Sequence, residues 1–70
     1  MKLSARNVLR GKIVKIVAGA VNAEVTVRLR GGDEIVAIIT MASAKSLKLK
    51  KGGEAYAVVK ASSVMIGVEH

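Results

Sequence analysis

The first residues of the chain combine several hydrogen-bond donors with an absence of acidic neighbours. The stretch Ser4-Ala5-Arg6-Asn7, followed by Leu9 and Gly11, brings together a hydroxyl, a guanidinium, a carboxamide and several backbone N–H groups. No carboxylate lies near them in sequence. Because these groups mainly donate hydrogen bonds, they favour an anion as their ligand.

Two hydroxyl residues, Thr40 and Ser43, stand where a short helix is expected to begin. The first turn of a helix leaves backbone N–H groups without partners, and this position commonly binds anions. A hydroxyl residue before a helix is also an ordinary N-cap. Both readings stay open from the sequence alone.

A third group of donors comprises Lys60, Ser62 and Ser63. Lys60 ends an apolar segment and is therefore expected to be partly buried, and a buried ammonium needs a counter-charge. The nearest acidic residues in sequence are Glu54 and Glu69, so an external anion would supply that charge. The alternative is an exposed surface lysine, which is the common environment of this residue type.

The elements that must position these donors are mostly strands. Residues 21–30 alternate strictly between apolar and polar, which predicts a half-buried strand. The turn Gly31-Gly32-Asp33 and the apolar run 35–40 complete a hairpin. An earlier strand is expected over residues 8–17, where Gly11 indicates either a bulge or a close backbone approach.

The second half of the chain is expected to hold a helix and two more strands. Thr40 would cap a helix over residues 41–47, and Gly52-Gly53 would follow it. Strands are predicted over residues 55–61 and 64–68. The order β-β-β-α-β-β predicts an all-β fold, a small OB-like Greek-key β-barrel with one short helix between strands 3 and 4, in a single domain over residues 1–70.

Composition limits how such a small domain can be stabilised. The 70 residues include no cysteine and one histidine, at the last position, so neither a disulfide nor a direct metal site is expected. Apolar residues make up 51% of the chain, more than a lone small domain normally buries. We therefore expect a homo-oligomer.

The net charge of +7 raises the alternative of a nucleic-acid-binding OB-fold module. Single-strand binders usually add aromatic platforms for base stacking, whereas this chain has one Tyr, no Phe and no Trp, so nucleic acid is not the expected partner. Without a signal sequence or an apolar run of membrane-spanning length, a cytoplasmic protein with no membrane partner is expected. Asp33 and Glu34 are the only adjacent acidic pair and lie in a turn, so an enzyme is not expected.

The chain resembles the molbindins, or Mop proteins, nearly from end to end. The resemblance is carried by the pattern SARNxLxG, by Thr40 with Ser43, and by two longer blocks, Val21-Asn22-Ala23-Glu24-Val25 and Val59-Lys60-Ala61-Ser62-Ser63-Val64-Met65. It implies one Mop domain that binds molybdate or tungstate in molybdenum storage and homeostasis. It also implies a homohexamer, a trimer of dimers, with oxyanions at the subunit interfaces.

The resemblance assigns residues to two kinds of site. The oxyanion would be held by Ser4, Ala5, Arg6, Asn7, Thr40, Ser43, Lys60, Ala61 and Ser62, partly from a neighbouring subunit. A second kind of site would lie near Val21, Asn22 and Ala23. Molybdate and tungstate are tetrahedral dianions without a proton near pH 7, which suits a cage of donors. Phosphate carries a proton that needs an acceptor, which this donor set supplies poorly, and an unmet buried polar group costs about 1–3 kcal/mol.

Overall fold

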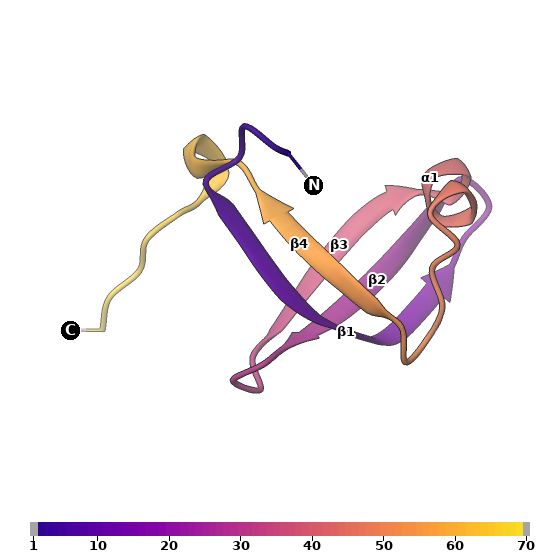
Figure 1. Ribbon diagram of the computed structural model, residues 1–70, viewed down its shortest axis with the longest axis horizontal. Coiled ribbons are helices and arrows are strands. Elements are labelled where there is room, and N and C mark those ends of the chain that lie inside the picture. Colours follow the sequence, from indigo (N-terminus) through magenta and orange to yellow (C-terminus); the bar gives the residue numbers. More distant parts are fainter. Residues whose placement is uncertain (1, 70) are drawn as a thin grey trace.

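The computed structural model describes residues 2–69 and contains a curled antiparallel sheet with one short α-helix (Figure 1). In chain order the elements are β1 (Asn7–Ala18), β2 (Asn22–Leu29), β3 (Glu34–Thr40), α1 (Met41–Ser46), β4 (Glu54–Val59) and the 3-10 turn η1 (Ala61–Ser63). The sheet order is β3-β2-β1-β4. The expected OB-like all-β fold, with its helix between the third and fourth strands, is confirmed.

The long first strand joins the two halves of the sheet. Its N-terminal half pairs with β4, from Asn7 opposite Val59 onwards, and its C-terminal half pairs with β2 as far as Ala18. The β1–β2 register shifts between Ile13 and Lys15, so a bulge lies within β1. Bulges bend a strand and increase its twist. This bend lets one strand serve two partners and curls the sheet.

Gly11 lies where β1 is in register with both neighbouring strands. A Cβ atom at this position would lie 2.4 Å from the carbonyl oxygen of Arg28 and 2.8 Å from Cγ1 of Val27. Of the two alternatives for this glycine, the close backbone approach is therefore correct, and the bulge lies a few residues further along. The glycine is required for β1 to approach β2.

The core is small and is centred on β1 and β2. Ile13, Val25 and Val27 are buried together, with Ile16, Leu29, Ile39, Leu49 and Ala55 packed partly against them. Thr26, predicted to face outward, is also buried, in register with Lys15 beside the bulge. Many large apolar side chains stay exposed on the single chain, including Val21, Ile38, Leu47, Met65 and Ile66. The folded subunit thus leaves much apolar surface in contact with water.

The C-terminal segment differs from the sequence prediction. The fourth strand ends at Val59 rather than at residue 61, because Ala61–Ser63 form η1. The prediction of a fifth strand over residues 64–68 is wrong for the single chain, since residues 64–69 belong to no helix or strand. The chain turns at η1 and leaves the sheet, so these residues meet no strand to pair with (Figure 1).

Candidate anion-binding site

The structure brings the first and third groups of predicted donors to one end of the sheet. Asn7 begins β1 and pairs with Val59 at the end of β4. The segments 4–7 and 60–62 therefore extend from adjacent strand ends, as Figure 1 shows. We call Ser4, Ala5, Arg6, Asn7, Lys60, Ala61 and Ser62 the terminal cluster. Seven of the nine residues predicted to hold the oxyanion belong to it.

Backbone donors in the terminal cluster are largely unused. Within η1, the N–H groups of Ser63 and Val64 donate to the carbonyl oxygens of Lys60 and Ala61, at 2.9 and 3.3 Å. Within residues 2–69, the N–H groups of Ser4, Ala5, Arg6, Ala61 and Ser62 donate to no carbonyl oxygen. Side-chain acceptors do not engage them there either. The cluster therefore offers several hydrogen-bond donors to a ligand or to solvent.

Two cations accompany these donors. Arg6 and Lys60 are exposed, and neither forms an ion pair in the part of the chain that the structure describes. The expected partial burial of Lys60 is wrong for the single chain, because β4 ends one residue earlier and Lys60 begins the turn into η1. The terminal cluster itself contains no carboxylate, so it is electropositive and suited to anions.

Thr40 and Ser43 lie elsewhere, at the start of α1. The predicted N-cap is present: the N–H group of Ser43 donates to Oγ1 of Thr40 at 3.0 Å. Asn22 pairs with Thr40, and the N–H group of Met41 donates to the carbonyl oxygen of Val21 at 2.8 Å. We call Thr40, Ser43, Val21, Asn22 and Ala23 the cap cluster. It unites the two remaining oxyanion residues with the predicted second site.

The side chains of the cap cluster differ in what they can offer a ligand. Oγ1 of Thr40 is occupied twice, because it also donates to Oγ of Ser43 at 2.9 Å. Oγ of Ser43 accepts that bond and keeps its own proton for another acceptor. Ala23 is 1% exposed, so its side chain is out of reach of a ligand, whereas Val21 is 72% exposed. Ser43 is therefore the better hydroxyl donor of the pair.

The two clusters lie at opposite ends of β1. Asn7 of the terminal cluster begins this strand of 12 residues, and Ala18 at its other end pairs with Ala23 of the cap cluster. A straight strand of this length would span about 36 Å. Although β1 is bent, η1 and α1 remain on opposite sides of the molecule in Figure 1. A single copy therefore does not bring all nine predicted oxyanion residues together.

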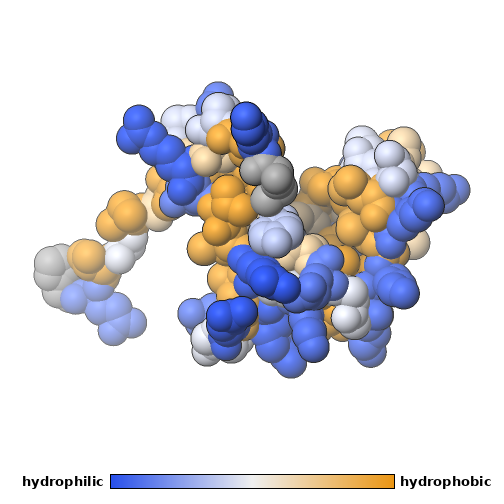
Figure 2. Space-filling view, viewed as in Figure 1, coloured by the Kyte–Doolittle hydropathy of each residue, from blue (hydrophilic) through white to orange (hydrophobic). Residues whose placement is uncertain are grey.

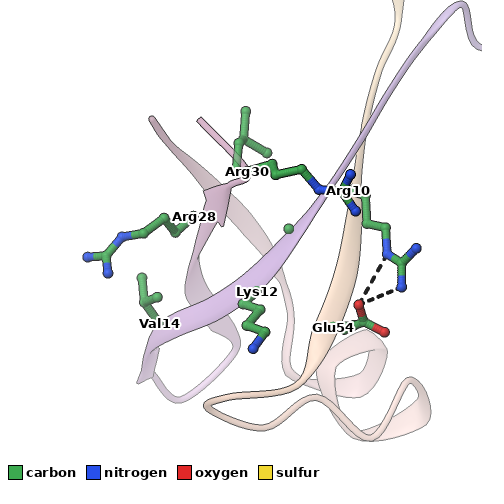
Figure 3. Close-up of a pocket in the computed structure, with 8 residues that line it drawn as sticks. Arg10, Lys12, Val14, Arg28, Arg30 and Glu54 are labelled. Atoms are coloured by element: carbon green, nitrogen blue, oxygen red, sulfur yellow. Dashed lines mark hydrogen bonds and ion pairs between the residues drawn. The ribbon is translucent and has the colours of Figure 1, made fainter. Parts of the chain in front are cut away.

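A second cationic feature lies on β1 and β2 and was not predicted. A groove of about 320 Å³ is lined by Arg10, Gly11, Lys12, Val14, Arg28, Leu29, Arg30 and Glu54 (Figure 3). Cations recur at alternate positions, with Arg10 and Lys12 in β1, Arg28 in β2 and Arg30 just after β2. Lys12 pairs with Arg28. This period-two pattern is visible in the sequence and would have predicted the groove.

Two glutamates neutralise part of this basic groove. Arg10 binds Glu54 with its Nε and Nη2 atoms at 3.1 and 2.6 Å, and Arg28 binds Glu34 in the same way at 3.1 and 2.7 Å. The hydrogen bond to Glu54, and then the charge of Glu54, raise the pKa of Arg10 above its ordinary value. Lys12 and Arg30 form no ion pair within residues 2–69, so they carry the uncompensated charge of the groove.

Residues 2–69 contain no cluster of three or more His, Asp or Glu side chains able to hold a metal ion. His70, the one histidine, lies outside the described residues. None of the described helices has the length and apolar character needed to cross a membrane. The donor clusters and the basic groove are the candidate sites for ligand binding.

Comparison with known proteins identifies the family of the chain. Residues 3–66 match the TOBE domain family. A probable molybdenum-pterin-binding protein of Haemophilus influenzae is 51% identical over 69 residues, covering 99% of this chain and all of that protein. The chain belongs to the molbindin-type TOBE domains. The family match spans both donor clusters, from Ser4 to Ser62.

Two solved structures show how closely the fold of this family is kept. MopII of Clostridium pasteurianum superposes with a TM-score of 0.91 at 45% identity, covering 96% of this chain and all of MopII. The cytoplasmic molybdate-binding protein ModG, solved with molybdate bound, superposes with a TM-score of 0.94 at 51% identity. That match covers 99% of this chain and 49% of the ModG chain.

Proposed function

We propose that this protein binds molybdate or tungstate in the cytoplasm, as a binding protein rather than an enzyme, and serves molybdenum storage and homeostasis. One observation carries the proposal: in the described part of the chain, the terminal cluster holds two cations without an ion pair and N–H groups without an acceptor, and the cluster contains no carboxylate. Such a set suits a tetrahedral dianion that needs donors and no acceptor. The names of the relatives and the molybdate in ModG support the choice of ion.

We propose further that the anion lies between subunits of a homohexamer built as a trimer of dimers. The support is geometric, because the terminal and cap clusters lie at opposite ends of β1. A site that uses both Lys60 and Ser43 therefore needs the terminal cluster of one copy beside the cap cluster of another. The second kind of site, near Val21, Asn22 and Ala23, would then lie beside the first at the same interface.

Selectivity in this site would arise from protonation and from size. Phosphate near pH 7 carries a hydroxyl for which the terminal cluster, with no carboxylate, supplies an acceptor poorly, and an unmatched buried polar group costs about 1–3 kcal/mol. Sulfate has no such proton and would be rejected because donors spaced for a larger ion do not close on a smaller one. The order of affinity expected is molybdate and tungstate above sulfate and phosphate.

The test is calorimetric titration of the protein with molybdate at pH 7, together with the variant Lys60→Ala. We expect Lys60→Ala to weaken binding strongly while the fold persists, because Lys60 is exposed and outside the core. Lys51→Ala is the matched control: it removes the same charge from an exposed lysine ahead of the other end of β4. Equal affinities of Lys60→Ala and Lys51→Ala would remove Lys60 from the site.

The basic groove favours a second candidate function, binding of a nucleic-acid strand. Lys12 and Arg30 carry its uncompensated charge, and phosphate contacts of that kind weaken as salt rises. The candidate requires salt-sensitive retention of an oligonucleotide that molybdate does not compete away. Loss of retention in Lys12→Ala, with molybdate affinity unchanged, would assign the two ligands to separate places.

A further inference from the structure

The cations of the basic groove lie close together on one face of the sheet. Arg10 and Lys12 are two positions apart in β1, so their side chains point to the same side. Lys12 pairs with Arg28, and Arg30 follows two positions later and lines the same groove (Figure 3). Like charges at opposite positions of a sheet are destabilising. This arrangement therefore works against folding, and a bound anion would relieve the repulsion.

The two glutamates beside the groove leave several donors free. A guanidinium has five N–H groups. Arg10 and Arg28 each bind a glutamate through Nε and Nη2, and their Nη1 atoms make no hydrogen bond within residues 2–69. Lys12 and Arg30 are exposed and form no ion pair in that part of the chain. Figure 2 shows hydrophilic side chains gathered over the lower part of the sheet. The groove can therefore hold more than one anionic group at a time.

The one aromatic side chain of the protein borders this groove. Tyr56 is the only aromatic residue in the sequence, and in β4 it is in register with Arg10. Paired positions of neighbouring strands share a face, with their Cβ atoms about 4.5–5.5 Å apart. The pKa of Arg10 is raised by the hydrogen bond to Glu54, by the charge of Glu54 and then by that of Tyr56, which agrees with this closeness. Tyr56 is 51% exposed, so part of its ring is open to a ligand.

A ring beside cations suits a ligand that is both planar and anionic. Proteins that bind single-stranded nucleic acids combine a positive groove with aromatic side chains on which bases stack. At about 320 Å³, the groove is near the lower limit of ligand pockets, so it suits a short stretch of chain and one stacked base. An acidic peptide would use the cations and leave the ring unused. A duplex hides the faces of its bases, so it would leave the ring unused as well.

We propose that the basic groove and Tyr56 together bind a short stretch of single-stranded nucleic acid. Lys12 and Arg30 contact its phosphates, and one base stacks on the ring of Tyr56. The proposal rests on the second candidate function and adds to it the base contact and the preference for single strands. Tyr56 and the residues that line the groove belong to neither the terminal nor the cap cluster, so this site and the oxyanion site can be tested apart.

The emission of Tyr56 tests the stacking contact directly. The chain has one Tyr and no Trp, so its intrinsic fluorescence comes from this side chain alone. We would titrate the protein at low salt with single-stranded oligothymidylate, with a duplex of that length and with polyglutamate. We expect the single strand to quench the emission, with recovery as salt rises, and the duplex and polyglutamate to leave it nearly unchanged. Equal quenching by the duplex or by polyglutamate would overturn the proposal.

Two variants of Tyr56 separate stacking from charge. Tyr56→Leu removes the ring and keeps an apolar side chain. We expect the dissociation constant of labelled oligothymidylate, measured by fluorescence anisotropy, to rise about 5- to 140-fold in this variant, as the loss of one stacked base predicts. Tyr56→Phe keeps the ring and should bind like the unmodified protein. Equal affinities of the two variants, with unchanged far-UV circular dichroism spectra, would contradict the stacking contact.

The salt dependence of binding tests the phosphate contacts. Lys12→Ala removes one of them, so the slope of log affinity against log salt should become shallower by about one. Lys51→Ala is the matched control, since Lys51 is exposed and does not line the groove. The same slope in both variants would overturn the assignment of a phosphate to Lys12.

The outcomes also separate this proposal from the functions on which it is built. Oligothymidylate that binds without quenching Tyr56 would overturn the base contact and leave the second candidate function standing. A protein that binds molybdate and no oligothymidylate would overturn both and leave oxyanion binding intact. The Tyr56 and Lys12 variants are expected to keep the molybdate affinity of the unmodified protein, because neither residue belongs to a donor cluster.

Discussion

Gly11→Ala tests whether the glycine of the N-terminal motif serves the fold or the ligand. The new Cβ atom would lie 2.4 Å from the carbonyl oxygen of Arg28, and real Cβ contacts essentially never fall below 3.0 Å. The backbones of β1 and β2 must therefore separate by at least 0.6 Å at this point. Both neighbouring strands constrain the position, since Gly11 is in register with Leu29 and with Ala55.

The expected loss follows from this displacement. Forcing extra atoms into a packed region costs about 1–3 kcal/mol. For a domain of this size each kcal/mol lowers the melting temperature by about 4–8 °C, so a decrease between about 4 and 24 °C is expected. A domain of 70 residues has a free energy of unfolding of roughly 4–10 kcal/mol, so the loss is a large share of it.

The assay is thermal unfolding followed by far-UV circular dichroism, at one protein concentration and without oxyanion, because association and ligand binding both shift the transition. Gly31→Ala is the matched control, since a Cβ there meets no atom within 4 Å. We expect the melting temperature of Gly31→Ala to stay within a few degrees of the unmodified protein. Equal melting temperatures for Gly11→Ala and Gly31→Ala would refute the role assigned to Gly11.

Three further outcomes are expected. Thr40→Ala should destabilise the protein by about 0.5–2 kcal/mol in urea titration, because the N-cap is lost. The stability of Thr40→Ser should be much closer to that of the unmodified protein, and equal losses of stability in the two variants would contradict the cap. Ile13→Ala should cost about 2–5 kcal/mol, because Ile13 is 1% exposed at the core centre, and Val17→Ala is its exposed control. Molybdate at one hundred times its Kd should raise the free energy of unfolding by about 2.7 kcal/mol and increase the hexamer fraction in sedimentation. Both effects should disappear in Lys60→Ala. An unchanged free energy of unfolding at well above millimolar molybdate would refute anion binding to the folded state.

The strands and the helix were predictable because their signals are local. Alternation of apolar and polar residues located β2, and the turn glycines located the hairpin, in which Gly32 has a φ of 98°. The cap at Thr40 was equally readable, since a hydroxyl before a helix bonds a residue three positions on. These features depend on neighbours within a few residues, which a sequence displays directly.

The remaining features depend on what lies beside each segment. Residues 64–68 have the composition of a strand, but a strand exists only where another edge pairs with it, and the single chain directs this segment away. The burial expected for Lys60 failed for a related reason, because the position of a strand end decides it. The grouping of donors into two clusters follows from the register of Asn7 with Val59 and of Asn22 with Thr40, which local patterns do not fix.

The pairing of β1 with β4 also governs when the terminal cluster can form during synthesis. The β1, β2 and β3 segments emerge first from the ribosome and can pair as consecutive hairpins, whereas Asn7 must wait for Val59. Translation at about 5–20 residues per second separates the synthesis of Asn7 from that of Val59 by several seconds. A nascent chain halted before β4 would carry the first half of the donor set without the second. Oxyanion capture would therefore mark molecules whose synthesis has reached the last strand.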